Sequence, residues 1–228
     1  DSAIDAMLSV VGIDRGDKVC DVGAGAAHLT LMLAARGLNI TAVEPNDAMR
    51  SNGIKRTSAL QNIYWHEGTG EQTDQESYSF DMVTFGSSFN VCDRAKALKE
   101  SARILKPKGW FACMWNHRQL ENEIQSQIEA IIKNRVPGYS YGSRREDQTE
   151  IVDACELFGP VVHLSSRVTH TQKISECLEA WRSHATLARQ AGISFESVIE
   201  AIEAYLTSLN IDIINIPYST NISIAQLR

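Results

Sequence analysis

The chain has 228 residues, of which 43% are hydrophobic and 22% are charged, and its formal net charge is −6 at pH 7. This size is typical of one α/β domain with an inserted segment, and it is large enough to bury a full core. The negative charge argues against docking on nucleic acid through a basic face, and the apolar stretches are far shorter than the roughly twenty residues that cross a membrane.

Strand and helix patterns alternate along the chain, which predicts a doubly wound, mostly parallel sheet of seven strands. A leading helix is expected over Ser2–Val11. Five strands are expected near Lys18–Val22, Asn39–Glu44, Ile63–Glu67, Phe80–Phe85 and Trp110–Trp115, with helices between them. The helix before the fifth strand is expected over about 93–105, because Pro107 and Gly109 are residues that end helices.

The regular alternation ends after residue 115. Helices are expected over about 121–135, 149–158, 175–190 and 194–209, and strands over about 161–171 and 211–216. We therefore expect a cofactor-binding α/β core over 1–115 and an inserted helical cap that binds the substrate. The cap would comprise 116–158 and 172–209, and the remaining strands of the core sheet would lie in 159–171 and 210–228.

The most informative motif is VCDVGAGAAHLT at 19–30, in which an apolar strand ends in an acid and a glycine-rich turn precedes a helix. Gly23 and Gly25 present bare backbone to a ligand and tolerate the positive φ that such turns need. The N–H groups at the start of the helix would face a carboxylate or phosphate. The motif indicates a nucleotide-type cofactor site, although a plain strand-to-helix connection also fits it.

The spacing of the glycines separates two cofactor classes. A dinucleotide fingerprint, G-x-G-x-x-G, would need its third glycine where this chain has His28. The pattern acid-x-G-x-G-x-G finds Asp21, Gly23 and Gly25 in place, with the small Ala27 at its last position.

The second expected strand of the core ends in Glu44, roughly twenty residues beyond the glycine turn. A doubly wound fold places an acid there to accept hydrogen bonds from ribose hydroxyls. Pro45 then ends the strand, and a helix follows from Asp47. A solvated strand end is the alternative interpretation of Glu44.

Five motifs together resemble the class I S-adenosylmethionine-dependent methyltransferases. They are VCDVGAGAAHLT at 19–30, AVEPNDAMR at 42–50, GTGEQ at 68–72, SFDMVTFGSSF at 79–89 and ALKESARILKPKGWFACMWN at 97–116. They occur in the order of the family and span about half of the chain. The W-N-H-R sequence at 115–118 and the I-P-Y-S-T sequence at 216–220 are similar to the small-molecule branch that includes trans-aconitate methyltransferase.

The resemblance implies a Rossmann-like methyltransferase fold and S-adenosyl-L-methionine as the cofactor. It also implies metal-independent transfer of a methyl group to a small-molecule acceptor by direct in-line displacement. Ligands of such sheets lie across the carboxyl ends of the strands. The expected cofactor-binding residues are Asp21, Gly23, Ala24, Gly25, Glu44, Pro45, Met49, Thr69, Gly70, Phe85 and Gly86. Thr69 and the neighbouring Ser87 also fit turn chemistry, and Met49 also fits a core position.

Candidate catalytic and substrate-binding residues cluster after the fifth strand. The sulfonium methyl group is already electrophilic, so the protein must align the acceptor, exclude water and, for some acceptors, remove a proton. We expect Asn116 and His117 to be catalytic, since an imidazole titrates near neutrality and suits a general base. A solvent-facing loop histidine is the alternative.

The expected substrate residues carry either a guanidinium or an aromatic ring. They are Trp115, Arg118, Tyr139, Tyr141 and Trp181. Arg118 would pair with a substrate carboxylate, and the rings would hold a flat acceptor or a cation. His184, one helical turn beyond Trp181, is a further candidate for the same pocket. Surface exposure of Arg118 and His184 and core packing of Trp115 remain alternatives.

Several other chemistries lack their sequence signatures. Phe85–Ser88 stand where amino-methyltransferases of nucleic-acid bases carry a [DNS]-P-P-[YFW] sequence, and no Pro-Cys pair supplies a cysteine nucleophile. Asp93 has no second acid suited to magnesium, and the five scattered cysteines support neither a disulfide framework nor a zinc site.

Two alternative functions stay open. One is a non-catalytic protein that binds S-adenosyl-L-methionine for regulation, and the other is an oxidoreductase with a nucleotide cofactor. With no signal-peptide pattern at its N-terminus, the protein is expected in the cytoplasm. The expected partner is a small-molecule acceptor and neither nucleic acid nor a membrane, while homo-oligomer formation is left open.

Overall fold

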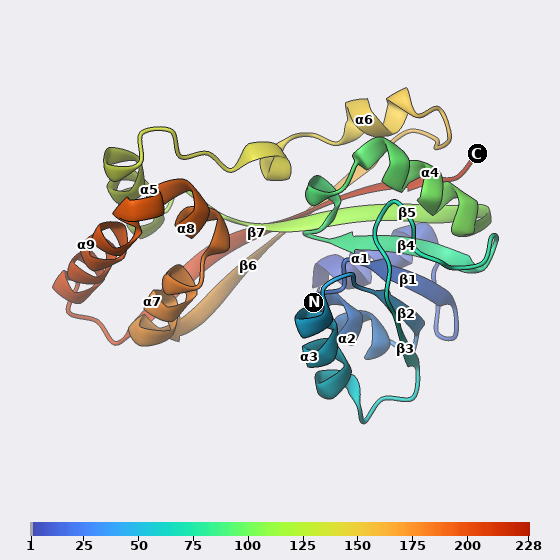
Figure 1. Ribbon diagram of the computed structural model, residues 1–228, viewed down its shortest axis with the longest axis horizontal. Helices are drawn as coiled ribbons and strands as arrows, with labels where there is room; N and C mark the ends of the chain where they lie inside the picture. The colour runs from blue at the N-terminus through green and yellow to red at the C-terminus, as the bar shows by residue number, and fades with distance from the viewer. Residues whose placement is uncertain (1) are drawn as a thin grey trace. The chain divides into compact units, whose positions relative to one another are not determined.

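The computed structural model describes residues 2–228, apart from the side chains of residues 143 and 144. The described chain divides into two compact units (Figure 1). Unit 1 comprises the residues up to 115 together with 146–166 and 220–228. Unit 2 comprises 116–145 and 167–219.

This division differs from the segments expected for a core and a cap. Residues 146–158 fall in unit 1, because Val152 packs with Phe111 and Phe158 in the core of that unit. Residues 210–219 fall in unit 2, because Ile214 and Ile216 pack among its helices. The role of unit 2 in binding a substrate stays a prediction.

Within residues 2–228, seven strands form one sheet with the order β3-β2-β1-β4-β5-β7-β6. The strands are β1 Lys18–Val22, β2 Asn39–Val43, β3 Ile63–His66, β4 Phe80–Gly86, β5 Leu105–Arg118, β6 Val162–Lys173 and β7 Ile213–Gln226. The pairings from β3 through β2, β1 and β4 to β5 are all parallel. The expected fold class, a doubly wound and mostly parallel sheet of seven strands, is therefore confirmed.

Strand β7 runs antiparallel to β5. The N–H of Leu227 donates to the carbonyl of Gly109, whereas the N–H of Gln119 donates to the carbonyl of Pro217. Residue numbers thus rise along one strand as they fall along the other. The same holds for β6 and β7, in which side-chain hydrogen bonds join Ser165 to Asn221 and Thr171 to Asn215.

Strand β5 is longer than expected at both ends. It was predicted over Trp110–Trp115, but Leu105 already pairs with Phe80 of β4. A register shift between Phe80 and Met82 accommodates the extra residues around Pro107. The proline therefore lies within an irregular strand and not in a loop that follows the helix.

The order of the strands reverses between β1 and β4, which are neighbours in the sheet. From β1 the chain continues outward to β2 and β3, and from β4 it continues to β5 on the other side. The connections that leave the carboxyl ends of β1 and β4 therefore diverge. Ligands of open parallel sheets bind at such a switch point.

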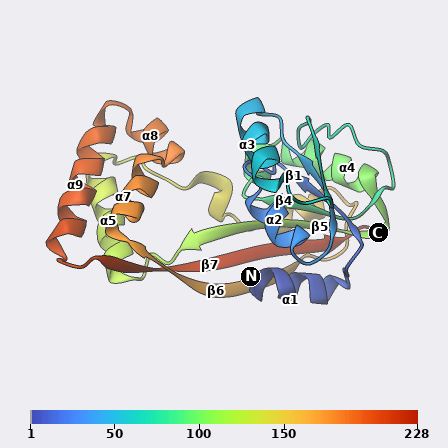
Figure 2. The ribbon, with the colours of Figure 1, turned by 90° about the horizontal axis from the view of Figure 1, so that it is seen from below.

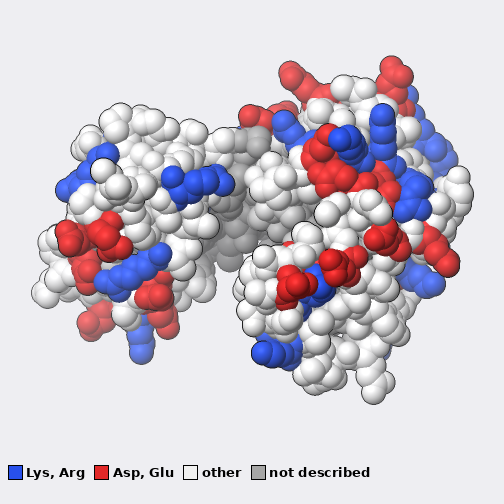
Figure 3. Space-filling model, viewed as in Figure 1, with Lys and Arg blue, Asp and Glu red and all other residues white. Residues whose placement is uncertain are grey.

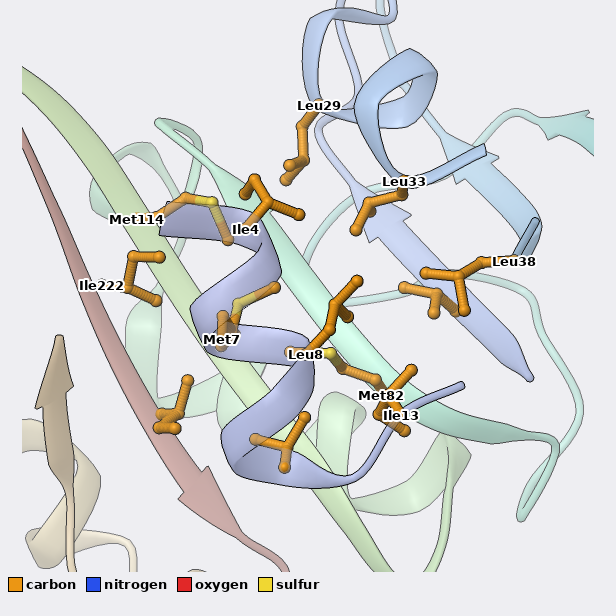
Figure 4. Close-up of a cluster of buried hydrophobic side chains, with 14 of the residues drawn as sticks. Ile4, Met7, Leu8, Ile13, Leu29, Leu33, Leu38, Met82, Met114 and Ile222 are labelled. Atoms are coloured by element: carbon orange, nitrogen blue, oxygen red, sulfur yellow. The ribbon is translucent and has the colours of Figure 1, made fainter. Parts of the chain in front are cut away.

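One face of the sheet in unit 1 is covered by α1 Ser2–Val11 and α2 His28–Ala34, and α3 Asp47–Thr57 lies beside α2. Helix α1 places Ile4, Met7 and Leu8 at helical spacing against the sheet (Figure 4). Met82 of β4 and Ile222 of β7 lie in the same cluster.

The opposite face is covered by α4 Arg94–Ile104 and α6 Thr149–Ala154. Its core contains Phe85, Phe89, Phe111 and Phe158, whose neighbouring ring centroids lie 5.2–5.7 Å apart. Such edge-on and tilted contacts stabilise aromatic clusters. Because the side chain of Phe85 packs in this cluster, the C-terminal end of β4 has a fixed orientation.

Among its described residues, unit 2 contains parts of β5, β6 and β7 and four α-helices that pack around them (Figure 2). They are α5 Glu123–Arg135, α7 Ile174–Arg182, α8 Ala185–Ala191 and α9 Phe195–Ser208. A single helix was expected over 175–190, but it is interrupted at His184, whose Nδ1 accepts the N–H of Leu187 and caps α8.

Acidic and basic side chains are interspersed on the face drawn in Figure 3. Arg182 forms ion pairs with Glu179 and Glu203. Over the described residues, no helix combines the length and the apolar character that crossing a bilayer requires.

Candidate active site

A cavity of about 390 Å³ lies in unit 1 at the carboxyl ends of β1 to β4. We call it the glycine-turn cavity. It is lined by Gly23, Gly25, Glu44, Pro45, Met49, Thr69, Gly70, Glu71, Ser87, Ser88, Val91 and Cys92. Seven of these residues are among the expected cofactor-binding residues, so the structure brings together positions that are 47 residues apart, from Gly23 to Gly70.

Gly23 begins the turn after β1 and has a positive φ of 68°. Its N–H donates to the carbonyl of Val43 at 2.8 Å, which ties the turn to β2. A Cβ atom at this position would lie 2.4 Å from Cβ of Ser88. Both the backbone conformation and the lack of space therefore require glycine.

Gly25 connects the turn to the acid at the end of β2. It also has a positive φ, of 56°, and its N–H donates to Oε2 of Glu44 at 2.9 Å. Ala27, where the resembling pattern has glycine, adopts a left-handed φ of 69° as well. An alanine is tolerated in this conformation at a cost of about 1–2 kcal/mol.

Glu44 lies at the floor of the cavity and is only 7% exposed. Besides the bond from Gly25, its Oε1 accepts the N–H of Asn46 at 2.9 Å. Each oxygen of an ionised carboxylate has capacity for a second hydrogen bond. Glu44 is thus a fixed acceptor that faces a cavity and still has capacity to accept hydroxyl groups.

The electrostatic character of the cavity is negative. Glu44 and Glu71 are its acidic residues, and among the described lining residues none is lysine or arginine. The carboxylate of Glu71 is held by the N–H of Asp93 at 2.5 Å. The cavity therefore favours a ligand with hydroxyl, amino or cationic groups over one with a pyrophosphate.

Two apolar side chains form part of the wall. Met49 is 44% exposed and Val91 is 79% exposed, so neither is a core residue. The core alternative for Met49 is thus excluded. Cys92 also lines the cavity, and burial raises the pKa of its thiol to about 11, which keeps the sulfur protonated near neutral pH.

Four of the expected cofactor-binding residues, namely Asp21, Ala24, Phe85 and Gly86, do not line the glycine-turn cavity. Asp21 is 1% exposed and accepts hydrogen bonds from the hydroxyls of Thr30 and Thr84 at 2.6 and 3.1 Å. The backbone of Ala24 donates to Val43, Phe85 lies in the aromatic cluster, and Gly86 lies against Leu29. Asp21 thus joins β1 to α2 and β4, while Ser87 and Ser88 take the lining positions after β4.

Burial raises the pKa of Asp21 from its ordinary value of 3.8 to about 6, although the two hydroxyls oppose this shift. The folded state therefore holds the proton more tightly than the unfolded state, and stability is lost as pH rises from about 4 to about 6. We expect the free energy of unfolding of the parent to fall by about 3 kcal/mol relative to that of Asp21→Asn over this interval. Urea denaturation of both proteins at pH 4 to 7 measures the difference, and a difference that does not change with pH would contradict the shift.

A second, smaller pocket of about 190 Å³ lies within unit 2. We call it the arginine pocket. It is lined by Asn116, His117, Arg118, Tyr141, Arg145, His184 and Tyr218. Both expected catalytic residues and two of the expected substrate residues, Arg118 and Tyr141, therefore share one pocket, together with the further candidate His184.

The other three expected substrate residues are buried side chains. Trp115 is 4% exposed and its Nε1 donates to Oδ1 of Asn90 in unit 1 at 2.9 Å. Tyr139 is 5% exposed and its ring centroid lies 5.4 Å from that of Tyr141. Trp181 is 3% exposed and stacks against Arg118 and His184. Tyr139 and Trp181 do not line the arginine pocket. They are buried and contact its lining residues Tyr141, Arg118 and His184.

Six lining residues of the two sites were not anticipated from the sequence, namely Glu71, Ser88, Val91, Cys92, Arg145 and Tyr218. Glu71 is part of the GTGEQ motif that supplied Thr69 and Gly70, so that motif contained the signal. Tyr218 is part of the I-P-Y-S-T sequence at 216–220, which was not linked to a substrate site, and the sequence near Arg145 contains no comparable motif. Among the described residues, no group of three or more His, Cys, Asp or Glu side chains is arranged to hold a metal ion.

The fold and the position of the glycine-turn cavity define a Rossmann-like methyltransferase fold. Residues 20–113 match the Methyltransferase domain family. The chain superposes on the YcgJ protein of Bacillus subtilis with a TM-score of 0.60 at 16% identity, over 100% of this chain and 98% of that one. It superposes on phosphoethanolamine N-methyltransferase 2 of Haemonchus contortus, solved with S-adenosyl-L-methionine, with a TM-score of 0.54 at 14% identity, over 99% of this chain and 52% of that one.

Similar sequences cover part of the chain. The demethylmenaquinone methyltransferase of Staphylococcus epidermidis is 33% identical over 113 residues, which are 47% of this chain and 46% of that protein. An uncharacterised methyltransferase of Mycobacterium tuberculosis is 35% identical over 105 residues, which are 44% of this chain and 40% of that protein. The chain thus spans less than half the length of these curated relatives.

Proposed function

We propose that the protein transfers a methyl group from S-adenosyl-L-methionine to a small-molecule acceptor. The observation that carries the proposal is the glycine-turn cavity, in which Glu44 is fixed by Gly25 and Asn46 at the carboxyl end of β2. The acid would accept the ribose hydroxyls of the cofactor. The match of residues 20–113 to the Methyltransferase domain family supports this assignment.

The charge of the cavity favours this cofactor over a dinucleotide. S-adenosyl-L-methionine carries a sulfonium and an ammonium group, which two carboxylates stabilise, whereas NAD carries a pyrophosphate. His28 at the third fingerprint position argues in the same direction. An oxidoreductase is therefore disfavoured.

The chemistry asks little of the protein beyond alignment of the acceptor. S-adenosyl-L-methionine supplies an electrophilic methyl group when it is bound. We propose that the arginine pocket of unit 2 binds the acceptor and that His117 removes a proton from it when it is a hydroxyl or an ammonium. The narrower similarity to the branch that includes trans-aconitate methyltransferase stays a prediction and assigns no acceptor.

Glu44→Ala is expected to weaken the binding of S-adenosyl-L-methionine by about 1–3 kcal/mol, because two charge-assisted hydrogen bonds to the ribose are lost. Isothermal titration calorimetry measures the affinity for S-adenosyl-L-methionine and for its demethylated product, with NAD as a ligand that should not bind. Glu76→Ala is the matched control, since Glu76 is exposed and lies outside the cavity. Equal affinity of Glu44→Ala and the parent would remove Glu44 from the ribose site.

A non-catalytic protein that binds S-adenosyl-L-methionine for regulation is the remaining candidate. No single residue is compulsory for methyl transfer, so a site that only binds the cofactor has the same lining residues. The two candidates differ in one result, the transfer of a labelled methyl group to any acceptor in a panel of small molecules. Binding without transfer to any member of a panel that includes carboxylates, phosphate esters, amines and phenols would favour regulation.

A further inference from the structure

The arginine pocket has a composition that points to the charge of its ligand. Its described lining comprises two guanidinium groups, two imidazoles, two phenol rings and one amide. No aspartate or glutamate is among these lining residues, and neither Arg118 nor Arg145 forms an ion pair with any described acid. The pocket therefore concentrates positive charge that the described part of the protein does not neutralise.

Arg118 is held in place by aromatic side chains. Its guanidinium carbon lies 4.1 Å from the ring centroid of Trp181, and its Nε donates to the hydroxyl of Tyr218 at 3.1 Å. Trp181 is itself buried in the core of unit 2. These contacts fix the plane of the guanidinium and occupy Nε, so a bound oxyanion would be received by the two terminal nitrogens.

Arg145 is positioned by a second and separate set of contacts. Its guanidinium carbon lies 4.3 Å from the ring centroid of Tyr141, and its Nη2 donates to the backbone carbonyl of Arg118 at 3.1 Å. The second bond brings this arginine to the end of β5, beside Arg118. The two cations are thus held near each other even though like charges repel.

The ring beneath Arg145 is fixed in its turn by an acid. The hydroxyl of Tyr141 donates to Oε2 of Glu129 at 2.5 Å, and Oε1 of Glu129 lies 3.1 Å from Nζ of Lys133. Glu129 is 8% exposed and is not a lining residue of the pocket. Its charge is therefore engaged with Lys133 and Tyr141, outside the pocket.

We propose that the acceptor carries an anionic oxygen group, a carboxylate or a phosphoryl group, that Arg118 and Arg145 bind together. This inference rests on the proposed function, since it assigns the chemical class of the acceptor. A planar guanidinium matches the paired oxygens of either group, and stacking on an aromatic ring reduces the entropy that binding would otherwise cost. Pairing with two arginines also lowers the nucleophilicity of the bound oxygens, so another atom of the acceptor receives the methyl group.

The arginine pocket has room for a small anionic group. A volume of about 190 Å³ accommodates an anionic group and a few further atoms. Asn116 and His117 line the same pocket as both arginines. An acid or phosphate ester could therefore place its anionic group on the arginines and a nucleophilic atom a few bonds away beside His117.

The test is a titration of the protein with succinate, citrate, inorganic phosphate and glycerol 3-phosphate at constant ionic strength. The indole N–H signal of Trp181 in NMR spectra reports on binding, because Arg118 stacks on this ring. We expect saturable shifts with at least one of these anions and binding that is at least tenfold weaker in Arg118→Gln and in Arg145→Gln. Arg189→Gln, an exposed arginine of α8 outside the pocket, should bind as the parent does.

Comparing carboxylates with phosphates shows which anionic group the acceptor carries. Tighter binding of the carboxylates indicates a carboxylic acid as acceptor, and tighter binding of the phosphates indicates a phosphate ester. The proposal is overturned if no anion gives a saturable shift, or if Arg189→Gln weakens binding as much as the two pocket variants. Because Arg118 packs on a buried ring, Arg145→Gln, on the short turn Gly142–Arg145, provides a second variant with a smaller structural role.

Calorimetry with S-adenosyl-L-methionine on the same samples separates this inference from the proposed function. Loss of anion binding with unchanged cofactor affinity in Arg145→Gln supports the inference. Cofactor binding by a parent protein that binds none of the anions overturns the inference alone. Anion binding by a parent protein that does not bind the cofactor overturns the proposed function and leaves an anion site of another purpose.

Discussion

Gly23→Ala is expected to reduce the affinity for S-adenosyl-L-methionine by at least about 100-fold. The added Cβ would lie 2.4 Å from Cβ of Ser88, a distance at which the turn or the serine must move. The left-handed φ of 68° adds about 1–2 kcal/mol of backbone strain for a non-glycine residue. Movement of this turn displaces the N–H groups and the wall of the cavity, so together the two effects cost about 3 kcal/mol or more of binding.

Gly12→Ala is the matched control for backbone strain. Gly12 has nearly the same φ, 67°, but a Cβ built there meets nothing within 4 Å. This variant should lose stability and keep its cofactor affinity. Calorimetry combined with thermal unfolding distinguishes the two outcomes, and a Gly23→Ala protein that binds the cofactor within threefold of the parent would contradict the assignment of the turn.

A second substitution separates the steric contribution from the backbone contribution. Adding Ser88→Gly to Gly23→Ala removes the side chain that the new methyl group meets, while the strained φ remains. We expect a partial recovery of affinity. The recovery is incomplete because Oγ of Ser88 also donates to the carbonyl of Val22 at 2.6 Å, which helps to hold the end of β1.

The glycine-turn cavity was predictable because its residues follow strands. Gly23 and Glu44 directly follow β1 and β2, and Gly70 lies four residues after the end of β3. The edge of a parallel sheet brings such positions together whatever the details of packing. After β4 the predicted lining residues, Phe85 and Gly86, lie two positions before the observed ones, Ser87 and Ser88. Phe85 and Gly86 still belong to that strand, whose alternating side chains direct Phe85 into the aromatic cluster.

Asp21 illustrates a different limit of sequence interpretation. The acid is at the expected position of the motif, but a strand residue faces one side of the sheet and not the loop beyond it. Here that side contains Thr30 of α2, whose hydroxyl donates to the carboxylate. The motif at 19–30 therefore identifies the position of the cavity, although the side chain of Asp21 contacts α2 and not the cavity.

The arginine pocket could be anticipated only in part. Asn116, His117 and Arg118 follow the apolar part of β5, and their common position was visible in the sequence. Arg145 and Tyr218 reach the pocket through contacts with Arg118 across 27 and 100 residues of chain, respectively. No local pattern encodes such contacts, because they depend on how unit 2 packs around its helices.

His117→Ala is expected to lower the turnover number for a hydroxyl or ammonium acceptor by about 10²-fold or more, with the affinity for S-adenosyl-L-methionine nearly unchanged. The imidazole lines the arginine pocket beside Asn116 and Arg118, where an acceptor bound by the arginines would present its nucleophilic atom. Loss of a general base has an effect of this size. Single-turnover kinetics with a labelled methyl group measure the chemical step, and calorimetry measures the cofactor affinity.

His170→Ala is the matched control, since His170 is an exposed residue of β6 that lies outside the pocket. Imidazole added to His117→Ala should restore part of the rate, because a small base fits the space left by the side chain, and it should not affect the control variant. A rate within a few-fold of the parent would remove His117 from the mechanism. Alignment by Asn116 and the two arginines would then be the main source of the rate, since an acceptor that is already deprotonated needs orientation and no base.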